Sequence, residues 1–226
     1  MIEYLDHIDK QVLLYINGMH SPFFDTFMWY VSKTTTWSLM LLALIIMLFR
    51  KNWRQALFVI LAIALTITLA DQISSGIIKN LVERFRPTHS PEIGSLVHLV
   101  NGYKGGLYGF VSSHAANTIG VALFISLLFK RRYLTITLFF WATLVSYSRI
   151  YLGVHYLGDI LGGICVGLLS GDIVYHLYLY AIQLKEINKK YGFIAFSEKN
   201  AKIMTCAIWC NLLITVGVSA ILCFVA

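Results

Sequence analysis

Long apolar segments alternate with short polar ones along most of this chain. A helix needs about 20 mainly apolar residues to cross about 30 Å of hydrocarbon, and we find candidate segments at residues 27–49, 54–78, 113–129, 133–152, 156–181 and 202–225. They predict an all-α protein built as a bundle of six transmembrane helices. Because every long polar stretch is needed to connect two of these segments, we expect residues 1–226 to form a single membrane-embedded domain.

The N-terminal segment has a different pattern, in which charged and apolar positions are mixed. Residues 3–19 combine Asp6, Asp9 and Lys10 with leucine, isoleucine and valine. This mixture suits an amphipathic helix that lies in the membrane interface, and an extended soluble terminus is the alternative. The segment lacks the basic start and the small-residue cleavage site of a secretory signal, so we expect it to belong to the mature protein.

The composition agrees with a membrane protein. Hydrophobic residues occupy 58% of the 226 positions and charged residues only 13%, which excludes an ordinary soluble domain. The four cysteines all lie inside apolar segments, at Cys165, Cys206, Cys210 and Cys223. Their spacing fits neither a disulfide framework nor a zinc site, so we expect them to be packing residues.

The lysines and arginines predict the orientation. Eleven of the eighteen lie in one alternate set of connections, near residues 50–54, 130–132 and 185–202. Cytoplasmic connections are rich in these residues, so we place this set in the cytoplasm and both termini on the outer face. Membrane anchoring and a phosphate pocket then explain the net charge of +7, and we expect no nucleic-acid partner.

The segment 156–181 contains five glycines at helical spacing, namely Gly158, Gly162, Gly163, Gly167 and Gly171. Small residues four positions apart allow a neighbouring helix to approach closely. We therefore predict that this helix is central in the bundle. Such packing would also hold the outer end of the helix in a fixed position.

Three polar clusters lie at the predicted outer ends of the helices. They read K-N-L-V-E-R-F-R-P, V-S-S-H and S-R-I-Y-L-G-V-H-Y-L-G-D, at residues 79–87, 111–114 and 148–159. Ionisable groups beside hydrocarbon are costly and by default indicate function. Taken alone, the first cluster could be snorkelling cations and the second a helix N-cap. Because the predicted topology places all three on one side, we expect them to converge.

The third cluster contains a candidate nucleophile. His155 and Asp159 are four residues apart, so on a helix the carboxylate can orient the imidazole ring. An oriented imidazole can attack phosphorus and form a phosphohistidine, which splits one difficult step into two. His114 can protonate the leaving alcohol and later accept a proton from the attacking water. We predict that these three residues are catalytic.

The remaining cluster residues suit phosphate binding. Lys79, Arg86 and Arg149 can surround an anion, the arginines with paired hydrogen bonds and the lysine as a point charge. Ser112 and the backbone near Ser113 add neutral donors at a helix N-terminus. Three fixed cations can supply the charge that magnesium supplies elsewhere, so we expect neither a metal ion nor a cofactor.

These residues resemble the motifs of the type 2 phosphatidic acid phosphatase superfamily, which shares its fold with the vanadium haloperoxidases. The first family motif, a lysine followed after six residues by Arg-Pro, matches Lys79, Arg86 and Pro87. The third, Ser-Arg, five residues, His, three residues and Asp, matches residues 148–159 in full. The matching region therefore extends over residues 79–159.

The second family motif, Pro-Ser-Gly-His, is altered in this chain. Val111 stands in place of the proline and Ser113 in place of the glycine, while Ser112 and His114 match. A Cβ at Ser113 restricts the backbone, so we expect a less close approach of that backbone to the phosphate.

The resemblance implies a membrane phosphatase that acts on a lipid phosphomonoester or diphosphate. Undecaprenyl diphosphate, lipid A, phosphatidylglycerophosphate and phosphatidic acid all fit it. The compact chain favours undecaprenyl diphosphate and lipid A as substrates. We therefore expect the protein in a bacterial inner membrane, with the site facing the periplasm. We expect the glycine-rich connection 88–112 to act as a lid over the site. The altered second motif leaves open a catalytically idle lipid-phosphate binder or transporter. A haloperoxidase is disfavoured because those enzymes are soluble.

Overall fold

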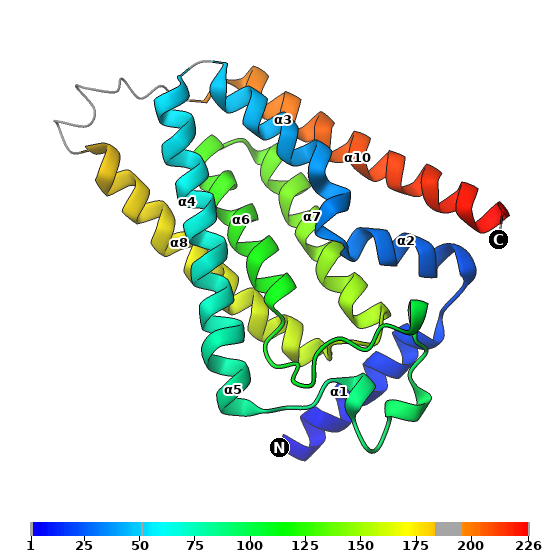
Figure 1. Cartoon of the computed structure of the whole chain (residues 1–226). Coiled ribbons are helices and arrows are strands. Elements are labelled where there is room, and N and C mark those ends of the chain that lie inside the picture. Colours follow the sequence, from blue (N-terminus) through cyan, green and yellow to red (C-terminus); the bar gives the residue numbers. More distant parts are fainter. Residues whose placement is uncertain (1, 51, 184–195, 226) are drawn as a thin grey trace.

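A computed structural model describes residues 2–50, 52–183 and 196–225 (Figure 1). Within these ranges the chain is helical and has no β-strand, which confirms the all-α prediction. The α-helices are α1 (Ile2–Gly18), α2 (Pro22–Ser32), α3 (Ser38–Phe49), α4 (Trp53–Asp71), α5 (Lys79–Val82), α6 (Ser113–Phe129), α7 (Arg132–Tyr151), α8 (Leu157–Gln183) and α10 (Glu198–Val225). Short 3-10 turns occur at Thr34–Trp37, Pro87–His89, Gly94–Leu96 and Val100–Gly102, and a π-helical segment, Gln72–Ile78, joins α4 to α5.

Among the residues that the structure describes, three helical stretches are long and apolar enough to cross a membrane. They are Trp53–Val82, Leu157–Gln183 and Glu198–Val225. They contain the predicted segments 54–78 and 202–225 in full and all of the segment 156–181 except residue 156. Helix α6 coincides with the predicted segment 113–129 and, with 17 residues, is shorter than the three stretches above. Helix α7 covers 133–151 of the predicted 133–152. The chain is a multi-pass membrane protein, and the count of six spans stays a prediction.

The first predicted span, 27–49, is not one straight helix. Helix α2 and the stretch Thr34–Phe49 are bent by 71° relative to each other. The bend occurs at Lys33, whose backbone is extended (φ −77°, ψ 126°) and whose ammonium lies 4.9 Å from the ring centre of Trp29. A cation followed by three β-branched threonines favours a helix break there, because these threonines are weak helix formers.

The prediction that the helix 156–181 is central was wrong, because α6 holds that place: none of the large apolar side chains of α6 is exposed, whereas Leu161, Leu169 and Leu177 of α8 are. Small residues four positions apart favour close contact with one neighbour and do not require enclosure on all sides.

Helix α8 lies beside α6. It packs most extensively against α6, which also contacts α7 and α4. A Cβ added at Gly163, Gly167 or Gly171 would lie only 2.5, 2.5 or 2.6 Å from a backbone oxygen of the facing helix. Only hydrogen in place of a side chain permits this approach.

The three predicted polar clusters lie at one end of the bundle (Figure 1), where α5 ends, α6 begins and α7 passes into α8. The connections α3–α4 and α6–α7, which carry basic residues, lie at the other end. Helix α1 packs at the cluster end. Its Asn17 donates to the carbonyl of Tyr151 over 2.8 Å and accepts from the backbone N–H of His98 over 2.8 Å. The position of α1 in the membrane interface stays a prediction.

The cysteines differ from the expectation. Cys165, Cys206 and Cys210 are exposed on the surface of α8 and α10 and do not fill the core. The prediction failed because an apolar segment of a membrane helix has an outward face that is as apolar as its inward face.

Candidate active site

Direct contacts join the three predicted clusters. A guanidinium nitrogen of Arg86, Nη1, lies 2.9 Å from Nε2 of His155 and links the first cluster to the third. The ammonium of Lys79 donates to Oγ of Ser113 over 2.7 Å and links the first to the second. The backbone N–H of Ser112 donates to the carbonyl of Asp159 over 2.9 Å and links the second to the third. Segments far apart in the sequence therefore form one site.

The hydrogen bonds of His155 specify its tautomer. Arg86 can only donate, so Nε2 of His155, at 2.9 Å, accepts and carries the lone pair. The proton then resides on Nδ1, which lies 3.2 Å from Oδ2 of Asp159 and donates to it. Both side chains are buried, at 1% and 0% exposure. This is the arrangement that a nucleophilic imidazole requires, with the free nitrogen away from the carboxylate.

The electrostatic surroundings keep the His155 ring neutral. Burial lowers the pKa of His155 well below its usual value of 6.5, and the positive charges of Arg86 and Arg149 and of Lys79 act in the same direction. A neutral ring retains the lone pair on Nε2 at neutral pH. The site can therefore hold the nucleophile in its reactive form without a separate base.

The connection 88–112 packs against Arg86. Nε of Arg86 donates to the carbonyl of Tyr108 over 3.1 Å, and its backbone N–H donates to the carbonyl of Leu107 over 3.0 Å. A Cβ at Gly109 would lie 2.8 Å from Oδ2 of Asp159. Glycine at this position therefore lets the connection approach the site closely. The function of the connection 88–112 as a lid stays a prediction.

Lys79 is held by two serine hydroxyls. Its Nζ lies 2.7 Å from Oγ of Ser113 and 3.1 Å from Oγ of Ser75, and the two hydroxyls are 2.6 Å apart. Ser75 belongs to the π-helical segment Gln72–Ile78, a helix type that often occurs at functional sites.

The altered second motif forms part of the packed structure. Ser113 is the first residue of the regular helix α6, so its Cβ requires no unusual backbone, contrary to the expected restriction. Its hydroxyl instead contacts Lys79. Val111 is 2% exposed and packs in a cluster with Ala70, Ala116 and Val166. Both departures from the family motif are therefore accommodated by local contacts.

Two buried donors of the predicted phosphate-binding set have no hydrogen-bond partner within the described ranges. They are Oγ of Ser112, in a fully buried residue, and Nε of Arg149, in a residue that is 3% exposed. The other guanidinium nitrogens of Arg149 donate to Oγ of Ser32 and to the hydroxyl of Tyr103, the latter over 3.4 Å. Buried donors are rarely unpaired in proteins, and an oxyanion could accept from both.

His114 is the second residue of α6 and lies among the same charges. The cations Arg149, Arg86 and Lys79 and the ring of His155 all act on it electrostatically. It is thus near the candidate nucleophile, as a proton donor to the leaving group would have to be.

Sequence reasoning missed Arg84 and its partners on α1. Arg84 contacts Asp159 over 3.2 Å, and Asp6 and Asp9 over 2.9 Å each. The available signals were weak: Arg84 precedes Arg86 by two positions, and the two acids are three positions apart on one helix face. Neither signal indicates which distant residue is contacted.

A separate group of possible metal ligands lies outside these clusters. The ligand atoms of His20, Asp25 and His98 are within 4.8 Å of one another. However, the two rings are stacked, with centres 3.9 Å apart and planes 12° apart, and Nε2 of His98 already contacts Asp25 over 2.8 Å. Parallel rings cannot both direct an in-plane lone pair at one ion. The group therefore fits a hydrogen-bonded tie between α2 and the connection 88–112.

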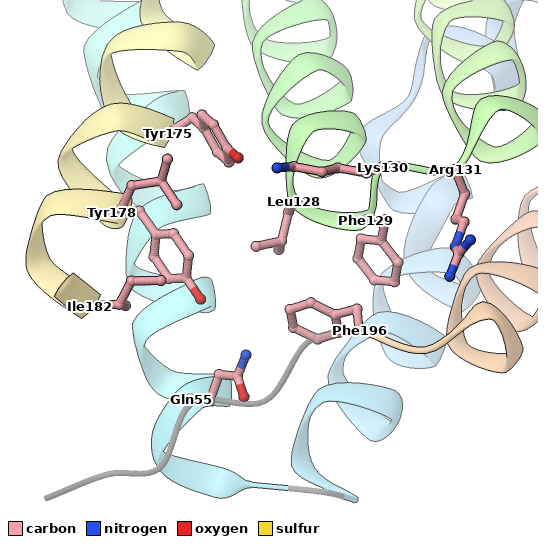
Figure 2. A pocket seen from close by; sticks show the side chains of 10 residues that line it. Gln55, Leu128, Phe129, Lys130, Arg131, Tyr175, Tyr178, Ile182 and Phe196 are labelled. Atoms are coloured by element: carbon pink, nitrogen blue, oxygen red, sulfur yellow. The ribbon is translucent and has the colours of Figure 1, made fainter. Parts of the chain in front are cut away.

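Figure 2 shows a cavity of about 500 Å³ at the opposite end of the bundle, between the end of α6 and the second half of α8. Lys130, Arg131, Tyr175 and Tyr178 are among the residues that line it. The described lining residues include no histidine and no carboxylate. The cavity thus lacks the groups that hydrolysis would require and does not compete with the clustered site.

Comparisons with known proteins identify the family of this chain. A family model described as the PAP2 superfamily matches residues 55–183. The chain is 42% identical over 181 residues to a lipid A 4'-phosphatase of Porphyromonas gingivalis, covering 80% of this chain and 77% of that protein. It is 44% identical over 180 residues to a lipid A 4'-phosphatase of Bacteroides thetaiotaomicron, covering 78% and 80%.

A solved structure shows a similar fold. The crystal structure of a transmembrane PAP2-type phosphatidylglycerolphosphate phosphatase from Bacillus subtilis matches with a TM-score of 0.59 and 24% identity, covering 80% of this chain and 89% of that chain. At this level of identity the likeness concerns the fold alone.

Proposed function

Because this chain belongs to the PAP2 superfamily and is a membrane lipid phosphatase, we propose that it removes the 4'-phosphate of lipid A through a histidine nucleophile and without a metal ion. The substrate proposal is supported by two lipid A 4'-phosphatases that are 42% and 44% identical to it over most of their length. The mechanism is supported above all by one observation, the alignment of Arg86, His155 and Asp159 in a buried row.

In the proposed first step, Nε2 of His155 attacks phosphorus and the bond from phosphorus to the leaving oxygen breaks. Arg86 exchanges its contact with Nε2 for one with a phosphate oxygen, which frees the lone pair. Asp159 retains the proton on Nδ1 and stabilises the positive charge that develops on the ring. His114, which becomes protonated when the negative substrate phosphate offsets the three cations, donates that proton to the leaving oxygen.

In the second step, water attacks the phosphohistidine. His114, now neutral, accepts a proton from the water, and the bond between phosphorus and Nε2 breaks to release inorganic phosphate. Lys79, Arg86 and Arg149 stabilise the charge on the phosphate oxygens in both transition states. Ser112 contributes its unpaired hydroxyl to the same oxygens.

The proposed site faces the periplasm of a bacterial inner membrane. The basic connections α3–α4 and α6–α7 lie at the end of the bundle away from the clusters, and cytoplasmic connections are the ones that carry such residues. A lipid in the outer leaflet of that membrane would then present its phosphate at the depth of the site.

Phosphate release from defined lipids tests this proposal. Purified protein in detergent is given lipid A that carries both the 1- and the 4'-phosphate, in the presence of a chelator, and mass spectrometry identifies which phosphate is lost. Undecaprenyl diphosphate, phosphatidylglycerophosphate and phosphatidic acid are compared as kcat/KM at equal mole fraction. Loss of the 4'-phosphate with the highest kcat/KM is expected, and preference for another lipid would contradict the substrate proposal.

The nucleophile is tested by trapping. After an alkaline quench, which preserves phosphohistidine, peptide mass spectrometry should find phosphate on His155. His155→Ala should reduce kcat by at least about 1,000-fold, and His176→Ala is the matched control because that side chain is 68% exposed and pairs with Asp172. Lipid binding without phosphate release by the wild type would favour the idle binder instead.

A further inference from the structure

Arg84 connects the buried carboxylate of the site to the N-terminal helix. Its Nη1 donates to Oδ1 of Asp159 over 3.2 Å and to Oδ2 of Asp9 over 2.9 Å. Its Nη2 donates to Oδ1 of Asp6 over 2.9 Å. The guanidinium also lies 4.1 Å from the ring centre of Tyr156. Four neighbours from two distant parts of the chain therefore fix one side chain.

The two oxygens of Asp159 have different partners. Oδ2 accepts from Nδ1 of His155 over 3.2 Å and from the backbone N–H of Tyr156 over 3.0 Å. Oδ1 accepts from Arg84. Because Asp159 is fully buried, an ionised carboxylate there needs a compensating cation. Arg84 supplies that charge and fixes the rotation of the carboxylate, and thereby the direction in which Oδ2 holds the ring.

Helix α1 is docked at this point by a second contact. Oδ1 of Asp9 accepts from the backbone N–H of Gly158 over 2.9 Å, directly before Asp159. A Cβ at Gly158 would lie 2.7 Å from Oδ2 of Asp9, so a larger residue there would displace the Asp9 carboxylate. Asp9 is largely buried, with a side chain that is 12% exposed. The contact is therefore specific, and α1 reaches the start of α8 as well as the cation.

We propose that Arg84 is a positioning residue for the His155–Asp159 pair and that α1, through Asp6 and Asp9, holds Arg84 in place. The inference rests on the proposed function. It assigns to α1 a part in the reaction besides membrane anchoring: the acids of α1 orient the guanidinium, the guanidinium orients the carboxylate, and the carboxylate orients the nucleophile. Ion pairs that only attached α1 to the bundle would not need to include Asp159.

The first test measures kcat and KM separately. Arg84→Gln should lower kcat by about 10- to 100-fold, the usual effect of removing an outer partner of an active group, with little change in KM because Arg84 does not contact the substrate. Arg84→Lys should restore part of the loss, and Asp9→Asn should give a smaller loss. The matched control is Lys10→Gln, since Lys10 contacts Asp6 and Glu92, both over 2.6 Å, without reaching Asp159.

A double-mutant cycle separates positioning from general stabilisation. If Arg84 acts through Asp159, Arg84→Gln should cause no further loss of kcat in protein that already carries Asp159→Asn. Losses that add would overturn the inference. An unchanged kcat in Arg84→Gln would also overturn the inference, whatever the unfolding temperature of the variant. Ion pairs that only stabilise the fold would affect the unfolding temperature and leave kcat unchanged.

A readout without turnover keeps this inference distinct from the proposed function. Orthovanadate bonded to His155 mimics the transition state. It should raise the unfolding temperature of the wild type and of Lys10→Gln. The rise in Arg84→Gln should be much smaller. If the wild type releases no phosphate yet shows this shift, the proposed function fails and the inference stands. An equal shift in Arg84→Gln overturns the inference, and no shift in the wild type contradicts both.

Discussion

At His155, two neighbours that can each form only one kind of hydrogen bond decide the state of the ring. Arg86 always donates, and an ionised Asp159 always accepts, so the ring carries its proton on Nδ1 and its lone pair on Nε2. The same cation that selects the tautomer also disfavours protonation of the ring. Arg86 thus has two effects on the His155 ring, besides the contact with phosphate that we propose.

The pH dependence of kcat/KM should reflect this. The pKa of His155 is lowered, so the ring stays neutral as the pH falls through 6.5, and activity is lost only at lower pH, when the ring becomes protonated. Arg86→Gln removes a cation next to the ring and should move this acid limb to higher pH. Ionisation of the substrate is the same for both proteins and cancels in the comparison. Coincident acid limbs would contradict the electrostatic role of Arg86.

Ser113, the residue that departs from the family motif, should affect substrate binding. Ser113→Ala removes the hydroxyl that lies 2.7 Å from the ammonium of Lys79 but retains the Cβ and the helix. A hydrogen bond to a charged group contributes enough for about a tenfold rise in KM, with a smaller change in kcat. Steady-state kinetics measures both, and Ser126→Ala, in the same helix but away from the site, is the control. An unchanged KM would show that Lys79 does not depend on Ser113.

At the level of the helices, the pair α6 and α8 sets the geometry of the site. The start of α6 carries the second cluster and the start of α8 carries Asp159, so the distance between the two helices decides whether the clusters meet. Gly163, Gly167 and Gly171 allow that distance to be short. The glycines therefore matter to the site although none of them carries a reactive group.

Gly167→Ala should weaken this packing. The new methyl group would lie 2.5 Å from the carbonyl oxygen of Ala116, and overpacking of this kind costs about 1–3 kcal/mol. We expect a lower unfolding temperature in detergent together with reduced kcat, because the clusters move apart. Gly217→Ala on α10 is the control, since a Cβ there meets no atom within 4 Å. Equal unfolding temperatures for the two variants would contradict the packing argument.

For the protein in its membrane, charge is separated between the two ends of the bundle. The clustered site and α1 lie at one end, and the basic connections α3–α4 and α6–α7 lie at the other (Figure 1). The membrane potential and the insertion machinery retain basic connections in the cytoplasm. In the orientation that we propose, this arrangement of charges places the site in the compartment opposite the cytoplasm.

Cysteine labelling in intact cells tests this orientation. In protein whose native cysteines are replaced by serine, Lys104→Cys in the connection 88–112 and Lys130→Cys at the other end both present exposed positions. A membrane-impermeant maleimide should label position 104 in intact cells and label position 130 only after the cells are permeabilised. The reverse result would place the site in the cytoplasm and contradict the proposed location.

The sequence was sufficient for the features that depend on local pattern. Helix α6 and the long stretches Trp53–Val82 and Leu157–Gln183 follow from apolar length, and the close contact between α8 and α6 follows from the glycines of α8. The predicted convergence of the clusters was correct. Successive helices run in opposite directions, so every second connection lies at the same end of the bundle. The expectation of one continuous helix over 27–49 was wrong, since apolar length alone does not reveal a break at Lys33.

Contacts between distant residues required the folded chain. Apolar periodicity and motif spacing are properties of neighbouring positions. They therefore indicate the helices, their close packing and the candidate site residues Lys79, His155 and Asp159 from the sequence itself. The tautomer of His155, the docking of Ser113 on Lys79 and the link from α1 through Arg84 to Asp159 depend on atoms that are brought together from positions up to 153 residues apart. Hydrogen bonds act over about 3 Å, and only the packing of the helices determines which groups come within that distance.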